Sequence, residues 1–355
     1  MRFLDEHRRR PATLADHLPW AGLVAPGVVL NKDGSFTTAF RFRGPDLESS
    51  TEDELVAVRA RINNALKRLG SGWCLHVEAR RRPGEPYPES GFAVPAAWLI
   101  DAERRAQFED AEPAFETDFR AALTWLPPAD ETRRLERWLY DGLARAGRDW
   151  RASLERFQRE AAAVLDLLGD ALLETARLDN EALLTWLHDC VSPKPHPVAR
   201  PETPMFLDAL LADAPLTGGV APRLGSCWLK VVSVRSLPAA TRPGLLDALS
   251  TLPFPYRWTA RWIGLDKPDA EREIVRLRKR WFAKRKGVGV LLREAITKEE
   301  VPLLDTDATA KTDECDGALE ALGAEACAYG YLTLTIAILD ADAALPAQKA
   351  RGAGA

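Results

Sequence analysis

The sequence lacks a phosphate-binding loop. It contains no Gly-Lys dipeptide anywhere in its 355 residues, whereas a Walker A loop needs a glycine-rich turn and a lysine that reaches the terminal phosphates of a nucleotide. The run Leu334–Asp340 has the form of a Walker B strand ending in an acid. Without an upstream phosphate loop, it is better explained as a buried strand. We therefore predict no P-loop NTPase domain, and neither ATP nor Mg²⁺ as a cofactor, in this chain.

The common signatures of catalytic and metal sites are also missing. None of the five histidines stands four residues from another, so there is no zincin pattern, and no G-x-S-x-G occurs. His188, Asp189 and Cys190 are adjacent, but neighbours on a helix point in different directions and do not form a triad. The sequence therefore predicts no catalytic residue, no cofactor-binding residue and no metal ligand.

Neither a disulfide framework nor a membrane span is indicated. The five cysteines are widely spaced and include no C-x-x-C pair, which is usual for a protein of a reducing cytoplasm. The longest apolar run, Tyr331–Leu339, is far shorter than the roughly 20 residues that cross a bilayer. We expect a cytoplasmic protein that does not span the membrane, although it can still lie against one.

Length and proline content predict two lobes. A chain of 355 residues, 46% of them apolar, is long enough for two compact cores. Residues 191–204 include five prolines, which remove backbone donors and stiffen the chain. We therefore predict an N-terminal α+β lobe at 1–190, a proline-rich linker at 191–204, a second α/β lobe at 205–340 and a flexible tail at 341–355.

Turn signals and apolar periodicity predict β-β-α-β for the first 80 residues. Asp33-Gly34 indicates a tight hairpin, because glycine tolerates positive φ. Apolar residues alternate in its second strand, which predicts one buried face and one solvent-facing side. Thr51 and Glu54 form a capping-box pattern at the start of a helix that stops at Gly70. Expected further elements are strands at 27–31, 36–43, 72–80 and 117–126, a helix at 97–109, an exposed loop at 81–95 and mainly helix at 131–190.

Strands and helices alternate in the second half, which favours helices packed on one face of a sheet. The whole chain is therefore predicted to be α+β, with mixed β-sheets and packed helices in two lobes, and a ferredoxin-like arrangement is consistent with this order. The expected strands are at 226–235, 256–264 and 329–339, and the expected helices are at 241–250, from near Asp269, and at 313–326.

A basic segment at 276–286 stands out in a chain of net charge -4. Its basic residues are Arg276, Arg278, Lys279, Arg280, Lys284, Arg285 and Lys286. With the interleaved Trp281 and Phe282, they fit contact with nucleic-acid phosphates and bases, or with anionic lipid or a protein partner. They also fit an ordinary solvated helix face, with Ile274, Leu277 and Trp281 turned to the core. The sequence leaves these alternatives open.

The strand at 256–262 is a weaker candidate for nucleic-acid binding. Its aromatic side chains, Tyr256, Trp258 and Trp262, share one face, while Arg257 and Arg261 share the other. Base-stacking sheets usually carry basic and aromatic side chains together. The segregation therefore favours an aromatic core face and an arginine face in solvent.

Several stretches, in order along the chain, resemble the TrbE/CagE-type family of conjugal-transfer and type IV secretion ATPases, with the TrbE branch the closest. They read LADHLPWAGLVAPGVVLNKDGSFTTAFRFRGPDLES, RINNALKRLGSGWCLHVEARRR followed by YPES, FRAALTWLPPAD and KRWFAKRKGVGVLLREA. The resemblance covers the N-terminal region of that family only. Family members continue into a motor with Walker motifs, and the present sequence ends before it.

The resemblance implies a non-catalytic assembly or docking portion of a conjugal-transfer ATPase. Such a protein would be cytoplasmic and peripheral to the bacterial inner membrane. Its partners would be inner-membrane subunits of the secretion apparatus and, in the full-length context, other copies of itself. ATP and Mg²⁺ are implied only for the motor domain. The alternative function, drawn from the residues, is a single-stranded nucleic-acid-binding module that uses the basic segment 276–286.

Overall fold

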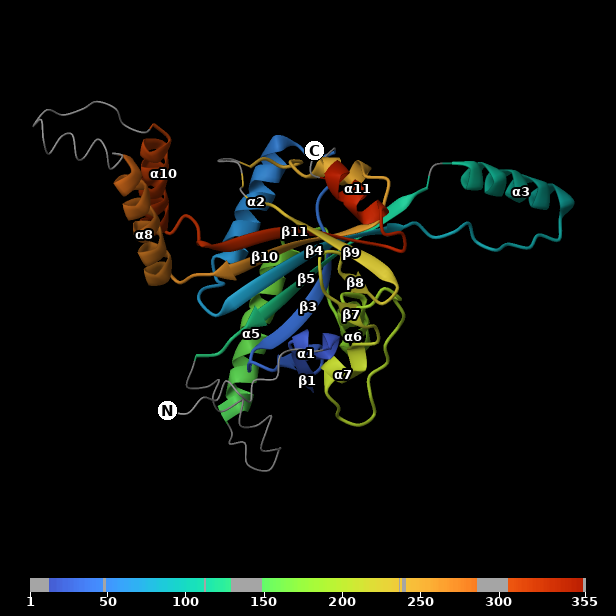
Figure 1. The fold of residues 1–355 in the computed structure, drawn as a ribbon, viewed down its shortest axis with the longest axis horizontal. Helices are drawn as coiled ribbons and strands as arrows, with labels where there is room; N and C mark the ends of the chain where they lie inside the picture. The colour runs from blue at the N-terminus through green and yellow to red at the C-terminus, as the bar shows by residue number, and fades with distance from the viewer. Residues whose placement is uncertain are drawn as a thin grey trace, which may run out of the picture.

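One antiparallel sheet dominates the computed structural model (Figure 1). The structure describes residues 13–46, 49–111, 113–128, 149–235, 237, 241–285 and 306–353. The eleven strands follow the order β1-β2-β3-β5-β4-β10-β11-β9-β8-β7, and β6 pairs with β3. Helices pack on this sheet, so the predicted α+β class is confirmed. Within the described ranges, no helix is long and apolar enough to cross a membrane.

The strands and helices have the following bounds. The strands are β1 Trp20–Ala25, β2 Val28–Asn31, β3 Phe36–Arg43, β4 Trp73–Pro83, β5 Phe115–Trp125, β6 Glu174–Arg177, β7 Leu216–Thr217, β8 Arg223–Leu224, β9 Cys227–Ser233, β10 Tyr256–Gly264 and β11 Gly330–Asp340. The helices are α1 Leu14–His17, α2 Glu52–Leu66, α3 Pro95–Asp110, α5 Asp149–Gly169, α6 Asn180–Asp189, α7 Leu207–Leu211, the 3-10 helix η2 Asp247–Thr251, α8 Lys267–Arg285, α10 Thr306–Gly323 and α11 Leu345–Ala353.

The predicted hairpin and capping box both form. Gly34 has φ +83°, which suits the tight turn between β2 and β3. At the start of α2 the backbone amide of Thr51 donates to Glu54 Oε2 at 2.8 Å, and the Glu54 amide donates to Thr51 Oγ1 at 3.3 Å. These local signals involve neighbours in sequence, so their geometry follows from the residues themselves.

Helices cover both faces of the N-terminal half of the sheet, which corrects the expected solvent-facing side of β3. The first five residues of β3 are all buried. Phe36 and Phe40 belong to one core with α2 and α5, whereas Ala39 belongs to a second core with α6 and α7. The small side chains of Thr37, Thr38 and Ala39 read as a polar face in sequence, but α6 and α7 pack over them.

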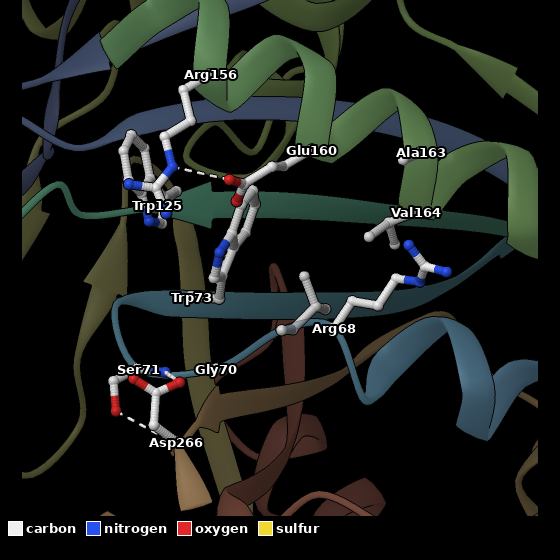
Figure 2. A pocket seen from close by; sticks show the side chains of 11 residues that line it. Arg68, Gly70, Ser71, Trp73, Trp125, Arg156, Glu160, Ala163, Val164 and Asp266 are labelled. Carbon is white, nitrogen blue, oxygen red and sulfur yellow. Dashed lines mark hydrogen bonds and ion pairs between the residues drawn. The ribbon is translucent and has the colours of Figure 1, made fainter.

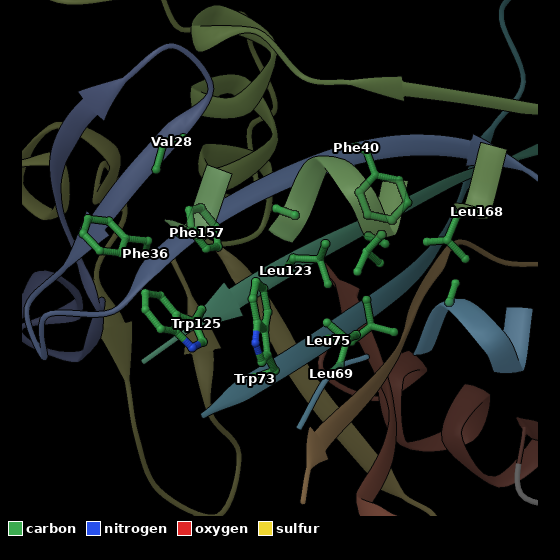
Figure 3. Close-up of a cluster of buried hydrophobic side chains, with 14 of the residues drawn as sticks. Val28, Phe36, Phe40, Leu69, Trp73, Leu75, Leu123, Trp125, Phe157 and Leu168 are labelled. Carbon is green, nitrogen blue, oxygen red and sulfur yellow. The ribbon is translucent and has the colours of Figure 1, made fainter. Parts of the chain in front are cut away.

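The larger core is built around stacked aromatic rings (Figure 3). The ring of Phe157 on α5 lies 5.7 Å from that of Phe36 and 5.8 Å from that of Trp73. Trp73 and Trp125, on neighbouring strands, have ring centroids 6.0 Å apart. The apolar stripe predicted along 154–168 is therefore the surface that α5 buries against the sheet.

The two halves of the chain share this sheet. β4 from the first half pairs with β10 from the second, in a ladder from Tyr256↔Arg81 to Ile263↔Cys74. The predicted linker at 191–204 also lies on the body, because Val191 and Val198 pack against the core of α6 and α7. The boundary at 191–204 stays a prediction, while the sheet itself is continuous across it.

Two expected elements differ in the structure. The helix predicted at 241–250 shrinks to η2, because Gly244 adopts φ +79° directly after Pro243 and interrupts a continuous helix. Most of the tail expected to be flexible at 341–355 forms α11. Ala350 of this helix is buried against Phe254 and Ile338, and Lys349 pairs with Asp340.

Candidate docking surfaces

Two projections leave the body at opposite ends of the sheet (Figure 1). One is the hairpin of α8 and α10, which carries the predicted basic segment. The other contains α3. Each follows directly from a strand, β10 before α8 and β4 before the loop that leads to α3, so both are held by the sheet at their base.

Hydrogen bonds fix the base of α8 to the turn before β4. The amide of Ser71 donates to Asp266 Oδ1 at 3.0 Å, and the Asp266 amide donates to Ser71 Oγ at 3.0 Å. Ser71 Oγ in turn donates to Asp269 Oδ2 at 2.6 Å. A Cβ added at Gly70 would lie 1.9 Å from Asp266 Oδ1, so glycine at this position permits the close approach. Because these bonds join distant parts of the chain, they set the direction in which α8 leaves the sheet.

The α8/α10 hairpin has a small apolar seam of its own. Ala270 and Ile274 of α8 are buried against Leu322 of α10, with Leu319 partly buried beside them. Of the three residues predicted to face the core, Ile274 is buried, Trp281 is half-buried and Leu277 is 41% exposed. The seam therefore covers the base of α8 more fully than its outer end.

The predicted basic residues lie on the exposed surface of α8, and several are paired. Arg276 pairs with Glu273 at 2.6 Å, and Arg278 Nε lies 2.7 Å from Asp316 Oδ1 on α10. Lys284 Nζ lies 4.7 Å over the ring of Trp281. These contacts fit the interpretation of a solvated helix face that its own acids partly neutralise.

Lys279 and Arg280 have a different environment from their neighbours. Both are exposed, and no ion pair joins either of them to another described residue. Arg285 is the last residue of α8, and Lys286 lies outside the described residues. The structure therefore leaves Lys279 and Arg280 as the cations of this segment best placed to meet an external anionic surface.

The arginine face of β10 is covered rather than open to solvent, which corrects the interpretation from sequence. Arg257 Nε lies 2.6 Å from Glu78 Oε1, and both side chains are nearly buried. Trp186 of α6 donates its indole N–H to the other oxygen of Glu78, and Arg80 pairs with Asp189 at 2.5 Å. This buried polar layer is a structural joint between α6 and the sheet.

Burial controls the protonation of this joint. Burial raises the pKa of the Cys190 thiol to about 12, so the residue stays a neutral thiol at physiological pH. Burial alone would lower the pKa of Arg257, but the acidic groups around it, among them Glu78, outweigh burial and raise that pKa above its usual value. The joint therefore holds a fixed ion pair and an unreactive cysteine, and it offers no nucleophile.

The α3 arm, residues 84–114, was not identified as a functional feature from the sequence. Its loop and helix hold each other: Tyr87 Oη donates to Asp101 at 2.8 Å, the rings of Tyr87 and Phe108 lie 5.6 Å apart, and Arg105 lies over Tyr87. No residue of α3 is buried, and the arm extends away from the sheet (Figure 1). It is therefore an ordered projection that the rest of the chain does not cover.

Large apolar side chains gather at the start of α3. Trp98, Leu99 and Ile100 are 56–63% exposed, and Phe92 and Val94 just before the helix are 47% and 61% exposed. Three consecutive apolar residues surround a helix instead of forming one face, so no single packing surface could bury them all. The run VPAAWLI was the available signal, but a short apolar run also fits a buried helix.

The groove between α5 and the base of α8 offers no reactive constellation (Figure 2). It encloses about 370 Å³ and is lined by Trp73, Trp125 and several charged residues. Arg156 pairs with Glu160 at 2.8 Å and lies 5.0 Å over the ring of Trp125, while Asp266 receives the Ser71 amide. The charged groups of the groove are thus occupied by structural contacts.

One group among the described residues has the arrangement of metal ligands. His188, His196 and Asp213 offer ligand atoms that lie within 4.8 Å of one another. His188 is on α6, His196 is in the proline-rich segment, and Asp213 follows α7. They are separated in sequence, so no spacing rule could identify them.

Comparisons with known proteins identify the family. Residues 27–133 match the family described as Type IV secretion system ATPase VirB4/TrbE, N-terminal domain. The conjugal transfer protein TrbE of Rhizobium radiobacter is 35% identical over 98% of this chain and 44% of the relative. A probable conjugal transfer protein TrbE of Sinorhizobium fredii is 41% identical over 35% of this chain and 85% of the relative.

The matched regions bear on what the chain contains. It spans less than half of the Rhizobium radiobacter relative, and the matching family region is an N-terminal domain rather than the catalytic one. The predicted resemblance is thereby confirmed. This chain belongs to the VirB4/TrbE family of type IV secretion ATPases and contains the N-terminal region of a TrbE-type member.

Proposed function

We propose that this chain is an assembly module that docks a TrbE-type ATPase onto the conjugal-transfer apparatus, and that it does not itself hydrolyse ATP. The observation that carries the proposal is the α3 arm. Trp98, Leu99 and Ile100 stand exposed at its tip, and exposed apolar clusters on an ordered support commonly mark protein contacts.

The charge of the arm favours a protein partner over an anionic membrane. Residues 84–110 contain six acidic and two basic residues, so the arm would be repelled by the negative surface of the inner leaflet. We propose that its apolar tip enters an apolar groove of a partner subunit at the inner membrane, with basic residues at the rim of that groove.

The opposite projection suits the membrane side of the assembly. On α8, Lys279 and Arg280 are exposed, and basic residues near the cytoplasmic leaflet are attracted by its anionic lipids. We propose a cytoplasmic location peripheral to the inner membrane, with this face of α8 toward the lipid. Association with further copies of the chain belongs to the proposal for the full-length protein, as does a motor half that binds ATP and Mg²⁺.

Co-purification with the subunits of the apparatus tests the docking role. The triple variant Trp98→Ser, Leu99→Ser, Ile100→Ser should reduce recovery of the inner-membrane subunits by at least about tenfold, because buried aromatic and aliphatic anchors dominate interfaces. The matched control replaces Leu173, Met205 and Val220, exposed apolar residues outside the arm, with serine and should leave recovery unchanged. Equal recovery with both variants would contradict docking through α3.

A turnover assay tests the non-catalytic claim separately. The purified chain, incubated with ATP and Mg²⁺, should release phosphate no faster than a buffer blank. Turnover that follows the protein through a final gel-filtration step would overturn this claim, whatever the result of the docking experiment.

The second candidate function is single-stranded nucleic-acid binding through the basic segment. Lys279 and Arg280 favour it, because they are exposed and form no ion pair with another described residue. The variant Lys279→Glu, Arg280→Glu should then abolish oligonucleotide binding that weakens steeply with salt. Under the docking proposal, the same change should instead release the chain from inner-membrane vesicles. Arg59→Glu, Lys67→Glu, on α2 and at its C-terminal cap, makes the same change in charge and is the control for both measurements.

A further inference from the structure

A histidine pair and a carboxylate meet where the proline-rich segment crosses the body. His188 Nε2 lies 3.0 Å from Asp213 Oδ2, and the rings of His188 and His196 have centroids 4.2 Å apart. The three residues come from α6, from the segment at 191–204 and from the chain just after α7. Two imidazoles and one carboxylate at this separation are a ligand set as well as a hydrogen-bonded cluster.

The burial of His188 distinguishes this cluster from a surface ion pair. Its side chain is 1% exposed, and its Nδ1 finds no hydrogen-bond partner among the described residues. Buried polar atoms nearly always have partners, and an exception calls for a bound ion, a water molecule or a functional reason. His196 and Asp213 are exposed beside it, so an ion would reach the cluster from solvent.

The surrounding groups orient the ligands as outer-shell partners do. The carbonyl oxygen of Lys194 lies 3.1 Å from His196 Nδ1, which leaves Nε2 of that ring free to bind an ion when Nδ1 carries the proton. Ser192 Oγ donates to Asp213 Oδ2 at 3.0 Å. Pro195 and Pro197 flank His196 and restrict its backbone. The cluster therefore needs little rearrangement before it can bind.

The charge state of the carboxylate also fits. Partial burial alone would raise the pKa of Asp213, but hydrogen bonds from His188 and Ser192 outweigh burial and lower that pKa. Asp213 is therefore ionised at neutral pH. One carboxylate and two imidazoles suit a borderline ion such as Zn²⁺, whereas Mg²⁺ and Ca²⁺ prefer sites made wholly of oxygen ligands.

We propose that His188, His196 and Asp213 form a three-ligand Zn²⁺ site that fastens the proline-rich segment between α6 and α7. Ligand atoms of a tetrahedral zinc ion lie about 3.3 Å apart, since each bond is about 2.0 Å. The 3.0 Å between His188 and Asp213 needs only a slight widening, and the exposed His196 ring can close the remaining distance. Solvent occupies the fourth position.

The site gives the segment at 191–204 a role that its prolines do not explain. Val198 already donates its amide to Thr185 Oγ1 at 2.9 Å, so the segment is attached to α6 at one point. A zinc ion adds a second attachment at His196 and joins it to the end of α7 through Asp213. Loading the site would then fix the path between the two halves of the chain.

Co²⁺ and Zn²⁺ titrations of the chelator-treated full chain test the proposal. One equivalent of Co²⁺ should produce the visible absorption of a tetrahedral complex and should be displaced by Zn²⁺. His196→Gln should weaken the affinity at least about 100-fold, and Ser192→Ala about 10- to 100-fold, as expected for a ligand and an outer-shell partner. The exposed His17→Gln is the matched control and should bind as the parent chain does.

The competing outcomes are distinct. A near-ultraviolet cobalt–thiolate band, or binding that survives both His196→Gln and Asp213→Asn, would locate the ion at cysteines and overturn the proposal. Absence of stoichiometric binding to the parent chain would overturn it as well. Because His196 is exposed, its variant should fold, and circular dichroism verifies this. Hydrogen exchange then gives a second measurement: Zn²⁺ should slow exchange at 194–198 in the parent chain and leave it unchanged in His196→Gln.

Discussion

Arg257 and Glu78 form the ion pair on which the joint between α6 and the sheet depends. Sequence alternation correctly separated Arg257 from the aromatic face of β10. It could not predict burial, because the residues that cover Arg257 come from α6, far away in the sequence. A strand pattern identifies which side chains share a face, but it does not say what packs on that face.

Removing Arg257 should destabilise the fold strongly. Arg257→Met leaves the Glu78 carboxylate nearly buried without its cation, and such a loss costs about 3–5 kcal/mol. The measurement is the free energy of unfolding from urea denaturation. Arg261→Met is the matched control: Arg261 is on the same strand face but exposed, so the change should stay within about 0.5 kcal/mol. Similar effects of the two variants would show that Arg257 is not buried in solution.

His76 should make stability depend on mild acid. Burial, and then the nearby Arg261, lower the pKa of His76 below its usual value. The unfolded chain takes up a proton at the ordinary pKa near 6.5 while the folded chain resists, so the free energy of unfolding falls as pH drops below about 6.5. His76→Gln should reduce the loss of stability between about pH 7 and about pH 5, measured by urea denaturation. His17→Gln should lose as much as the parent, and an unchanged loss in His76→Gln would contradict the argument.

At the scale of elements, the success of prediction follows sequence distance. The β2–β3 hairpin, the capped start of α2 and the strand β10 are encoded by turn residues, caps and alternation within short windows, and all three form as predicted. The α3 arm was missed as a feature because its helix was predicted at 97–109 while its exposure depends on the rest of the chain. α11 was missed because ADAALPAQKARGAGA has few large apolar residues to indicate packing.

The packing of α11 can be tested with two equivalent alanines. Ala350 is buried beside Phe254, whereas Ala347 is exposed on the same helix. Ala350→Asp places a carboxylate in an apolar contact and should cost about 1–3 kcal/mol, measured as a lower midpoint of urea denaturation. Ala347→Asp should cost less than about 0.5 kcal/mol. Equal, small effects would restore the expectation of a flexible tail.

At the scale of the whole molecule, the central question is whether the chain unfolds as one unit or two. Proline content and length favoured two lobes, and neither signal carries information about pairing between strands some 180 residues apart. β4 and β10 are bonded along most of their length, and this ladder places the second half of the sheet beside the first. Non-local pairing of this kind has no local signature, because each strand satisfies its own pattern with any partner of suitable register.

Heat should therefore unfold both halves in a single transition. Because the β4–β10 ladder lies in the middle of the sheet, loss of either half exposes the unpaired edge and apolar faces of the other. Calorimetry should give one peak whose measured enthalpy equals the van't Hoff enthalpy. Thr259→Pro is the test variant: Thr259 pairs with Glu78 on β4 and with Thr335 on β11, and proline removes a ladder donor from a central strand. It should lower the midpoint of the whole transition. A split into two peaks, with only the later one shifted, would instead mean that the halves are separate lobes that share a sheet without sharing stability.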